Sequence, residues 1–217
     1  MRLLGLFLTI FITSYVFSEE SDFQYTERMA YQGDTKAQFF LGYLYDRGRG
    51  VPQDYNQAVY WYGKAAEKGY SSAQFKLGNM YNHGKGVTQD HNQAIHWYEK
   101  AAGQGVVQAQ YNLGLTYLEG KGVAQDNSKA AYWFKKAAEQ GDQDAQYNLG
   151  NFFEFGLGVD LDYVKGYMWF NISLYSGYAD ASKARDSISK KMTSEQIAEA
   201  QRMAREWVDH FEKRKKE

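Results

Sequence analysis

AQFKLGNMYNHGKGV at residues 73–87 decides the fold, because three near copies of it stand elsewhere in the chain. The copies read AQFFLGYLYDRGRGV at 37–51, AQYNLGLTYLEGKGV at 109–123 and AQYNLGNFFEFGLGV at 145–159. Successive copies lie 36 residues apart, with no insertion or deletion between them. Repetition at such a period is typical of a solenoid, in which each unit buries its apolar side only against its neighbours.

The first nine residues of each copy predict an α-helix. An apolar residue at every fourth position, such as Leu41 and Tyr45, lies along one face of that helix. Gly42 and its three counterparts stand in the middle, where glycine costs about 1 kcal/mol relative to alanine. We expect close approach of a second helix to offset this cost, with its small residues Ala65 and Ala66 lying against the glycine.

The rest of each copy predicts a turn and a second helix. A G-x-G triplet ends the first helix, because glycine adopts the left-handed terminating conformation at low cost. Asp54 is placed to cap the next helix, and Gln57 stands where the partner in a capping box would. Apolar residues around Trp61 then follow at the spacing of a core-facing helix. Each unit is therefore expected to be a helical hairpin.

The ends of the array depart from this pattern. Residues 19–36 predict an N-terminal half-repeat that matches the second helix of a unit and acts as a cap. Four full units follow at 37–72, 73–108, 109–144 and 145–180. Residues 181–212 predict a closing pair of helices, of which the longer starts with a capping box at Thr193 and Gln196. Residues 213–217 form a basic tail.

The segment before the array predicts export. Residues 1–18 read as a signal peptide, in which Arg2 precedes an uncharged run and Val16 and Ser18 suit a cleavage site. The run is shorter than the roughly 20 residues of a membrane-spanning helix, which favours cleavage over an uncleaved anchor. We therefore expect a periplasmic or secreted chain with no stable membrane span after cleavage.

Composition restricts the kinds of function. The 25 basic and 26 acidic residues balance, so no broad positive field favours nucleic acid as a partner. The chain has no cysteine, which excludes disulfides. His91 and His96 are five residues apart, which does not place them on one helix face as zinc ligands. We expect no catalytic residues, no metal and no cofactor, and therefore a protein that is not an enzyme.

The complete pattern carries a family resemblance. A-Q-x-x-L-G, then G-x-G-V-x-x-D, then A-x-x-W-[YF]-x-K-A-A-x-x-G resembles the Sel-one-like repeat, a relative of the tetratricopeptide repeat. The resemblance implies an all-α, right-handed superhelix (solenoid) of helix pairs with a concave binding face. It also implies a non-catalytic adaptor that binds a protein or peptide, and we expect a monomer.

Two other functions stay open beside the adaptor. Cysteine-rich members of the family, reported to bind or cleave penicillins, are held by a disulfide in each repeat, and this chain has none. A hydrolase acting on cell-wall or penicillin-like compounds is therefore the weaker alternative. A secreted factor that interacts with a host protein is the other alternative, and it differs from the adaptor only in its destination.

Positions that change from copy to copy predict where a partner binds. They stand at i, i+3 and i+7 of the first helix, which places them on one face, and by analogy with the family this face lines the inner curve. Asparagine there can bond the backbone of an extended peptide, and aromatic rings can hold its side chains. Drift at solvated positions is the alternative explanation. The set comprises Phe40, Tyr43, Arg47, Lys76, Asn79, His83, Asn112, Leu115, Glu119, Asn148, Asn151 and Phe155.

Overall fold

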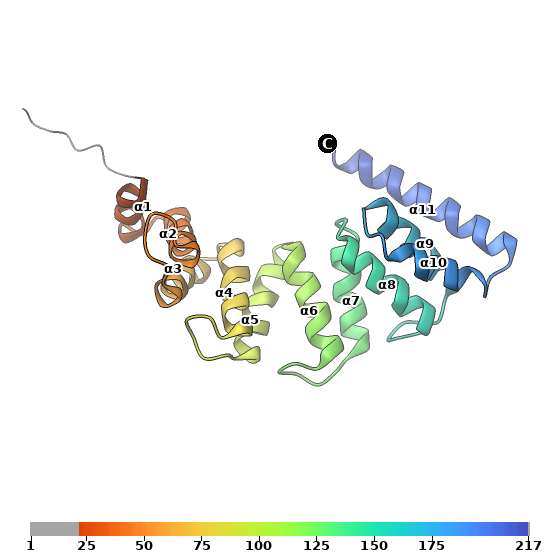
Figure 1. Ribbon diagram of the computed structural model, residues 1–217, viewed down its shortest axis with the longest axis horizontal. Coiled ribbons are helices and arrows are strands. Elements are labelled where there is room, and N and C mark those ends of the chain that lie inside the picture. Colours follow the sequence, from red (N-terminus) through yellow and green to blue (C-terminus); the bar gives the residue numbers. More distant parts are fainter. Residues whose placement is uncertain (1–21, 217) are drawn as a thin grey trace, which may run out of the picture.

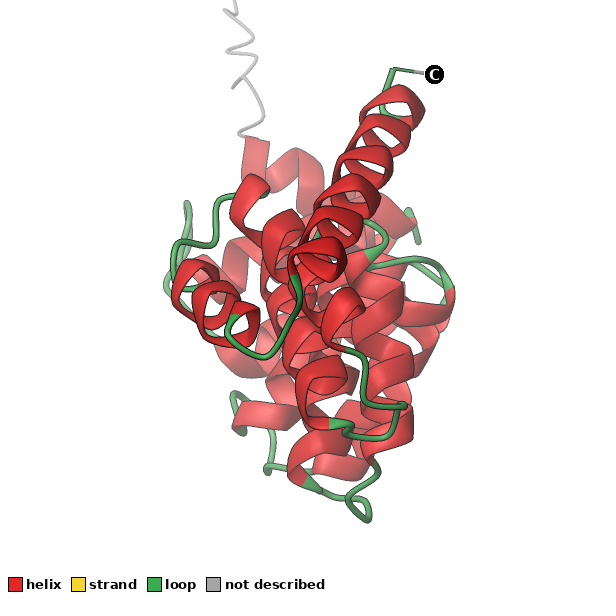
Figure 2. Cartoon of the chain, turned by 90° about the vertical axis from the view of Figure 1, so that its right-hand side faces the viewer, coloured by secondary structure: helices red, strands yellow, loops and turns green. Residues whose placement is uncertain are grey.

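The computed structural model describes residues 22–216, and within that range every regular element is a helix (Figure 2). The predicted signal peptide at 1–18 lies outside the described residues. The helices are α1 (Asp22–Tyr31), α2 (Thr35–Arg47), α3 (Tyr55–Glu67), α4 (Ser71–His83), α5 (His91–Gly103), α6 (Val107–Glu119), α7 (Asn127–Ala138), α8 (Gln143–Phe155), α9 (Tyr163–Tyr175), α10 (Ala181–Ser189) and α11 (Ser194–Arg214).

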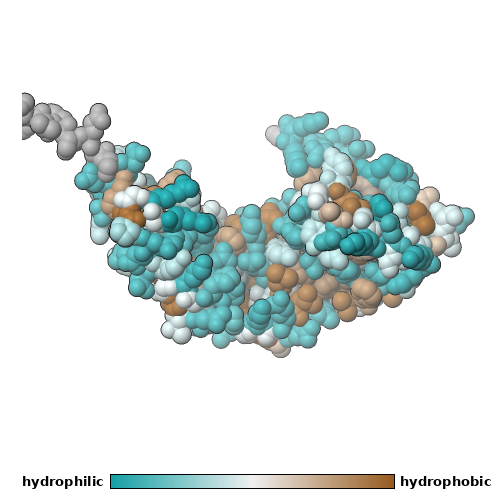
Figure 3. Space-filling view, in the orientation of Figure 1, coloured by the Kyte–Doolittle hydropathy of each residue, from teal (hydrophilic) through white to brown (hydrophobic). Residues whose placement is uncertain are grey.

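The helices follow one another along an arc whose two ends, α1 and α11, rise on the same side (Figure 1). The four predicted units are the hairpins α2–α3, α4–α5, α6–α7 and α8–α9, and the second helix of each packs on the first helix of the next. The space-filling view shows the hollow between the two ends of the arc (Figure 3). The predicted all-α solenoid is confirmed.

An aromatic ring covers the glycine in the middle of each first helix. A Cβ built on Gly78 would lie 2.7 Å from ring carbons of Tyr98, which is 1% exposed. The same relation joins Gly42 to Tyr62, and it recurs in the last two units with Phe134 and Phe170. The prediction that alanines lie against the glycines is therefore wrong. The space that glycine leaves is filled by ring carbons, and a ring buries more apolar area than a methyl group.

The backbone at the alanine pairs is bonded to the next unit. Gln74 on α4 is buried, and its Nε2 donates to the backbone oxygen of Ala66, 3.1 Å away on the preceding α3. Gln110 and Gln146 bond Ala102 and Ala138 in the same way. At the N-terminus, Gln38 Nε2 bonds the oxygen of Ala30 in α1 at 3.2 Å. Helix α1 thus occupies the place of a second helix relative to α2, and the bounds of the half-repeat at 19–36 stay a prediction.

Aspartate caps start the second helices as expected. Asp90 Oδ1 accepts from the backbone N–H groups of Asn92 at 2.9 Å and Gln93 at 3.1 Å. The Asp54 carboxylate does the same for α3, so it satisfies the terminal donors without a reciprocal bond from Gln57, whose predicted capping box is not formed. A capping box does form at Thr193 and Gln196, where it was predicted.

The last two helices both pack on α9. Helix α11 crosses obliquely over the end of the stack (Figure 2), and Trp207 meets Trp169 edge-on at a centroid distance of 5.6 Å. Phe211 stacks on Trp207 at 4.8 Å and covers Gly141 at the turn before α8. The apolar side of α11 therefore closes the C-terminal end across the last unit.

Candidate functional site

A cavity that we call the first pocket lies between the first and second units. It encloses about 430 Å³ between the C-terminal halves of α2 and α4. Three of its lining residues, Arg47, Lys76 and Lys85, are basic, and Asp46 is acidic. Four of the predicted site residues meet here, namely Arg47, Lys76, Asn79 and His83.

The loop after α4 delivers Lys85 to this pocket. Gly86 has a φ of 68°, and a Cβ there would clash with the backbone oxygen of Tyr55 at the start of α3. Only glycine therefore lets the loop lie against the preceding unit. As a result, the Lys85 ammonium lies 5.5 Å from the centroid of the Tyr55 ring, where a cation–π attraction holds it at the rim.

The wall of the first pocket is a buried tyrosine. The Tyr62 hydroxyl donates to Asp46 Oδ2 at 3.4 Å. Burial and the nearby Asp46 carboxylate raise the pKa of Tyr62 above its ordinary value, so the phenol stays neutral and keeps its donor. The carboxylate of Asp46 is thereby bonded within the protein, and three basic residues line the space beside it.

A second pocket repeats the first one unit further along. It encloses about 210 Å³ and is lined by His83, Asn112, Leu115 and Glu119, all four of them predicted site residues. Its wall is Tyr98, whose hydroxyl donates to Asn79 Oδ1 at 2.7 Å.

Asparagines join the units at this second pocket. Asn112 Nδ2 also donates to Asn79 Oδ1, at 3.3 Å, so the Tyr98 cluster links α4, α5 and α6. Burial raises the pKa of Tyr98 to about 12, which keeps its hydroxyl protonated at neutral pH. Both asparagines are half-buried, so part of their bonding capacity serves the protein itself.

The remaining predicted site residues lie outside these two pockets. The exposed Phe40 lines a separate hollow of about 250 Å³ against α1. The ring of Tyr43 lies 5.6 Å from the Arg49 guanidinium, and Asn148 Nδ2 bonds Asp144 of its own helix at 2.8 Å. Asn151 is half-buried, and Phe155 is exposed with the Lys191 ammonium 5.6 Å from its ring. Their role in binding stays a prediction, as does the placement of the whole set on the inner curve.

Several lining residues escaped sequence reasoning. Tyr62 and Tyr98 were expected only as core, because the helix pattern does not reveal that their hydroxyls reach the pockets. Lys85 and Lys121, inside the G-x-G triplets, were not among the predicted site residues, although each lines a pocket. Comparing the loops across copies offered a signal, since Arg49, Lys85 and Lys121 give way to Leu157 in the last unit.

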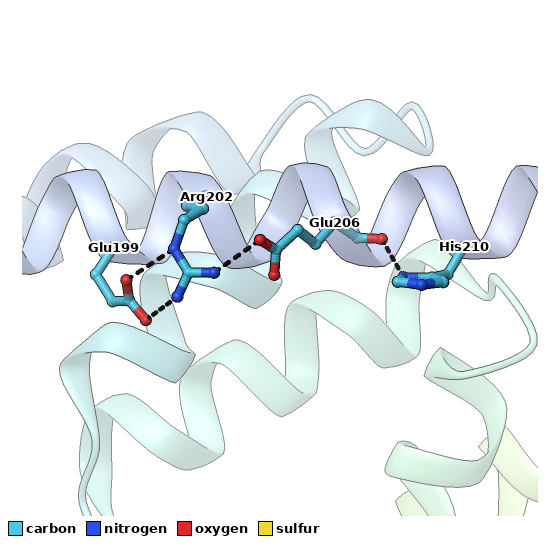
Figure 4. A network of polar contacts seen from close by, with 4 residues as sticks. All are labelled: Glu199, Arg202, Glu206 and His210. Atoms are coloured by element: carbon cyan, nitrogen blue, oxygen red, sulfur yellow. Dashed lines mark hydrogen bonds and ion pairs between the residues drawn. The ribbon is translucent and has the colours of Figure 1, made fainter.

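Two further features lie at the C-terminal end of the array. A cleft of about 420 Å³ lies between α9 and α11 and is lined by Tyr175, Arg205 and Val208, but it has no counterpart in the other units. Figure 4 shows Arg202 bonded to Glu199 at 2.6 Å and to Glu206 at 2.7 Å along α11. These exposed contacts at i, i+3 and i+4 support a long helix and enclose no cavity.

Neither a metal cluster nor a membrane helix is found in the described part of the chain. Between residues 22 and 216 no three histidine, aspartate or glutamate side chains gather closely enough to hold a metal ion. No helix in the same range combines the length and apolar character needed to cross a membrane.

Comparison with known proteins agrees with the geometry. The Sel1 repeat model matches residues 35–70, 71–106, 107–142 and 143–178, with the predicted period and a frame that starts two residues earlier, where the first helices begin. No curated protein matches the chain.

Two solved structures are similar over most of the chain. The protective antigen c5321 of uropathogenic Escherichia coli, which displays an SLR fold, is 37% identical with a TM-score of 0.77, covering 87% of this chain and 41% of that one. A Sel1 repeat protein of Oxalobacter formigenes is 41% identical with a TM-score of 0.70, covering 76% of this chain and 48% of that one. The chain thus spans less than half the length of either relative. On its four matched units and its fold, this chain belongs to the Sel1 repeat family.

Proposed function

We propose that this chain is a non-catalytic scaffold that binds an extended segment of another protein along its first helices, across the first and second pockets. Sel1-repeat proteins are generally protein-interaction scaffolds. The observation that carries the proposal is that the two pockets are lined by the positions that vary between units.

The division between constant and variable positions gives the proposal its physical basis. Leu77 and Gly78 recur in every unit and are buried, so they maintain the hairpin. Lys76 and Asn79, on either side of them, line the first pocket. Lysine occurs at this position only in the second unit, and asparagine at the position of Asn79 recurs in one other unit. Side chains that line a pocket but not the core can change without refolding, which is what a binding surface requires. No observation on the described residues favours the hydrolase alternative.

Export remains part of the proposal and rests on residues 1–18 alone. Mass spectrometry of the chain isolated from its native host tests it. We expect a mature form that begins after Ser18 and fractionates with the periplasm or the medium. An intact N-terminus in the cytoplasmic fraction would contradict export and, with it, the secreted host-interaction alternative. The expected monomer is checked by light scattering on the same material.

Site-specific photocrosslinking tests the scaffold proposal. A photoreactive phenylalanine replaces His83, which is exposed and lines both pockets, and a control chain carries it at Tyr132, which is exposed on α7. We expect a defined covalent adduct from position 83 in the native host and none from position 132. The purified partner must then bind the wild-type chain and bind His83→Ala more weakly. The proposal would be refuted if position 83 formed no adduct, or if positions 83 and 132 gave adducts in equal yield.

A further inference from the structure

The first pocket is a local departure from the charge balance of the chain. Arg47, Lys76 and Lys85 stand against a single acidic residue, Asp46, whereas the whole chain has 25 basic and 26 acidic residues. The positive charge here is therefore not the consequence of a basic protein. It is a property of this one pocket.

The cations of the first pocket are available to a ligand. No residue in the described range forms an ion pair with Arg47 or Lys76. His83 Nδ1 bonds the backbone oxygen of Asn79 at 2.8 Å, which leaves its Nε2 free to meet a partner. Asp46 keeps its negative charge while its carboxylate accepts from the Tyr62 hydroxyl, and the three cations of the pocket outnumber it.

The second pocket has the same walls with different chemistry. At the positions 36 residues after Arg47, Lys76 and His83 stand His83, Asn112 and Glu119. The cation equivalent to Lys85 is Lys121, and it pairs with Glu119 at 2.5 Å. The second pocket is therefore nearly neutral and rich in amide groups, although its backbone repeats that of the first. His83 lines both, so one continuous segment can pass from the first pocket to the second.

We infer that the partner is recognised through an extended acidic segment, whose carboxylates lie in the first pocket and whose uncharged residues lie across the second. The inference rests on the proposed scaffold function. A space of about 430 Å³ accommodates a few side chains and not a folded domain, so the segment is an exposed tail or loop of the partner. Arginine and lysine at the rim pair with carboxylates, and the asparagines beside them satisfy uncharged backbone.

Fluorescence anisotropy with two labelled peptides tests the inference on the full chain. The first is a 12-residue peptide (about 40 Å extended) with glutamates in one half and serine and asparagine in the other. The second carries glutamine in place of each glutamate. We expect the wild-type chain to bind the acidic peptide at least about tenfold more tightly, because several exposed ion pairs add at roughly two- to fivefold each.

A matched pair of variants distinguishes binding in the first pocket from nonspecific attraction to positive charge elsewhere on the chain. Arg47→Gln with Lys76→Gln should weaken binding of the acidic peptide by roughly five- to twentyfold and leave the neutral peptide unchanged. Lys64→Gln with Lys136→Gln removes the same charge from exposed positions on α3 and α7 and should change neither. Equal losses from the two pairs would show nonspecific attraction and overturn the inference.

A third variant transfers the chemistry of the first pocket to the second. Asn112→Lys with Glu119→His gives the second pocket two of the residues of the first and leaves His83 in the place of Arg47. It should strengthen binding of a peptide that is acidic along its whole length by roughly fivefold. If the wild-type chain binds both peptides alike while the crosslink at position 83 still forms, the acidic segment is refuted and the scaffold stands. If no crosslink forms, the scaffold itself fails.

Discussion

Adding a Cβ atom to a glycine of this fold is tolerated at some positions and damaging at others. In the middle of α4, glycine costs helical stability but lets the Tyr98 ring lie close to the backbone. In the middle of α3, Gly63 has no neighbouring atom within 4 Å of where a Cβ would stand. The same residue type in the same kind of helix is therefore required at one position and dispensable at the other.

Gly78→Ala is expected to destabilise the chain, and Gly63→Ala to stabilise it. The new methyl group at 78 would meet Tyr98, which cannot move aside because it is buried and its hydroxyl bonds Asn79. We expect the free energy of unfolding to fall by roughly 1–3 kcal/mol. At 63 only the helix propensity changes, for a gain of about 0.5–1 kcal/mol. Urea denaturation followed by circular dichroism measures both, and a gain at both positions would contradict the packing account.

Buried glutamines show a second distinction at the scale of one residue. Gln104 and Gln140, each 30 residues after a buried glutamine, donate to the side-chain oxygens of Gln74 and Gln110 at 2.8 and 2.7 Å. The equivalent positions after Gln38 and Gln146 are Lys68 and Ser176. Lys68 donates to the backbone oxygen of Gly33 at 2.6 Å instead, and the Ser176 side chain is too short to reach Gln146. Within the described range, Gln38 and Gln146 are accordingly the buried glutamines whose Oε1 lacks a protein partner.

Ser176→Gln is therefore expected to stabilise the last unit. The backbone of Ser176 has φ −75° and ψ −6°, close to the −90° and 8° of Gln104, so a glutamine there can reach Gln146 in the same geometry. Satisfying a buried acceptor adds about 1 kcal/mol to the free energy of unfolding. Ser176→Leu supplies similar bulk without a donor and serves as the control in thermal denaturation. An equal gain from leucine would show that packing and not the hydrogen bond is responsible.

At the scale of elements, aspartate caps begin most helices of the array but differ in their electrostatics. Asp162 caps α9, and although burial opposes its ionisation, the backbone N–H and ammonium of Lys165 hold its pKa below the usual range. Asp142 caps α8, and burial raises its pKa by more than the N–H of Ala145 lowers it. Folding thus lowers the pKa of one cap and raises that of the other.

Replacing the two caps by asparagine is expected to give opposite pH dependence. Folding lowers the pKa of Asp162, so its contribution is present above the unfolded value of about 3.9 and is lost as pH falls through the folded pKa. Folding raises the pKa of Asp142, so its contribution is present below about 3.9 and is lost as pH rises toward the folded pKa. Asparagine also caps helices but does not titrate.

Relative to wild type, Asp162→Asn should therefore lose stability as pH rises from 3 to 7, and Asp142→Asn should gain it. Urea midpoints across this range measure the two trends. Parallel trends for both variants would contradict the assignment of the pKa shifts.

The sequence predicted the elements better than the contacts between them. The 36-residue period placed each hairpin and each glycine helix end, because these depend on residues within one unit. Tyr98 on Gly78 escaped prediction, since the pattern gives the face of a helix but not the rotamer of its side chains. Lys85 escaped for a different reason: its position depends on Gly86 meeting Tyr55 of the preceding unit. The lining residues on the first helices were thus among the predicted positions, whereas the tyrosines of the second helices and the lysines of the loops were not.

At the scale of the whole molecule, the arc has no single centre. Each hairpin packs only on its neighbours, and the row is closed by α1 at one end and by α10 and α11 on α9 at the other. Stability in such a row is approximately a sum of units and the interfaces between them. A change at one end should therefore lose its effect within a unit or two.

A chain that ends at Met192 tests this one-dimensional behaviour. It lacks α11, so it loses the Trp207 contact with Trp169 and the Phe211 cover on Gly141. We expect amide hydrogen exchange to accelerate in α9 and α10 and at the start of α8, because these lose the neighbour that shields them. Exchange in α2 to α5 should stay as in the complete chain, and so should the two pockets between those units. If protection fell equally along the whole chain, the units would fold as one cooperative body and binding at the first pocket would depend on the distant cap. Unchanged protection at the N-terminal units would instead show that the pockets are independent of the C-terminal closure, as a row of neighbour-supported hairpins requires.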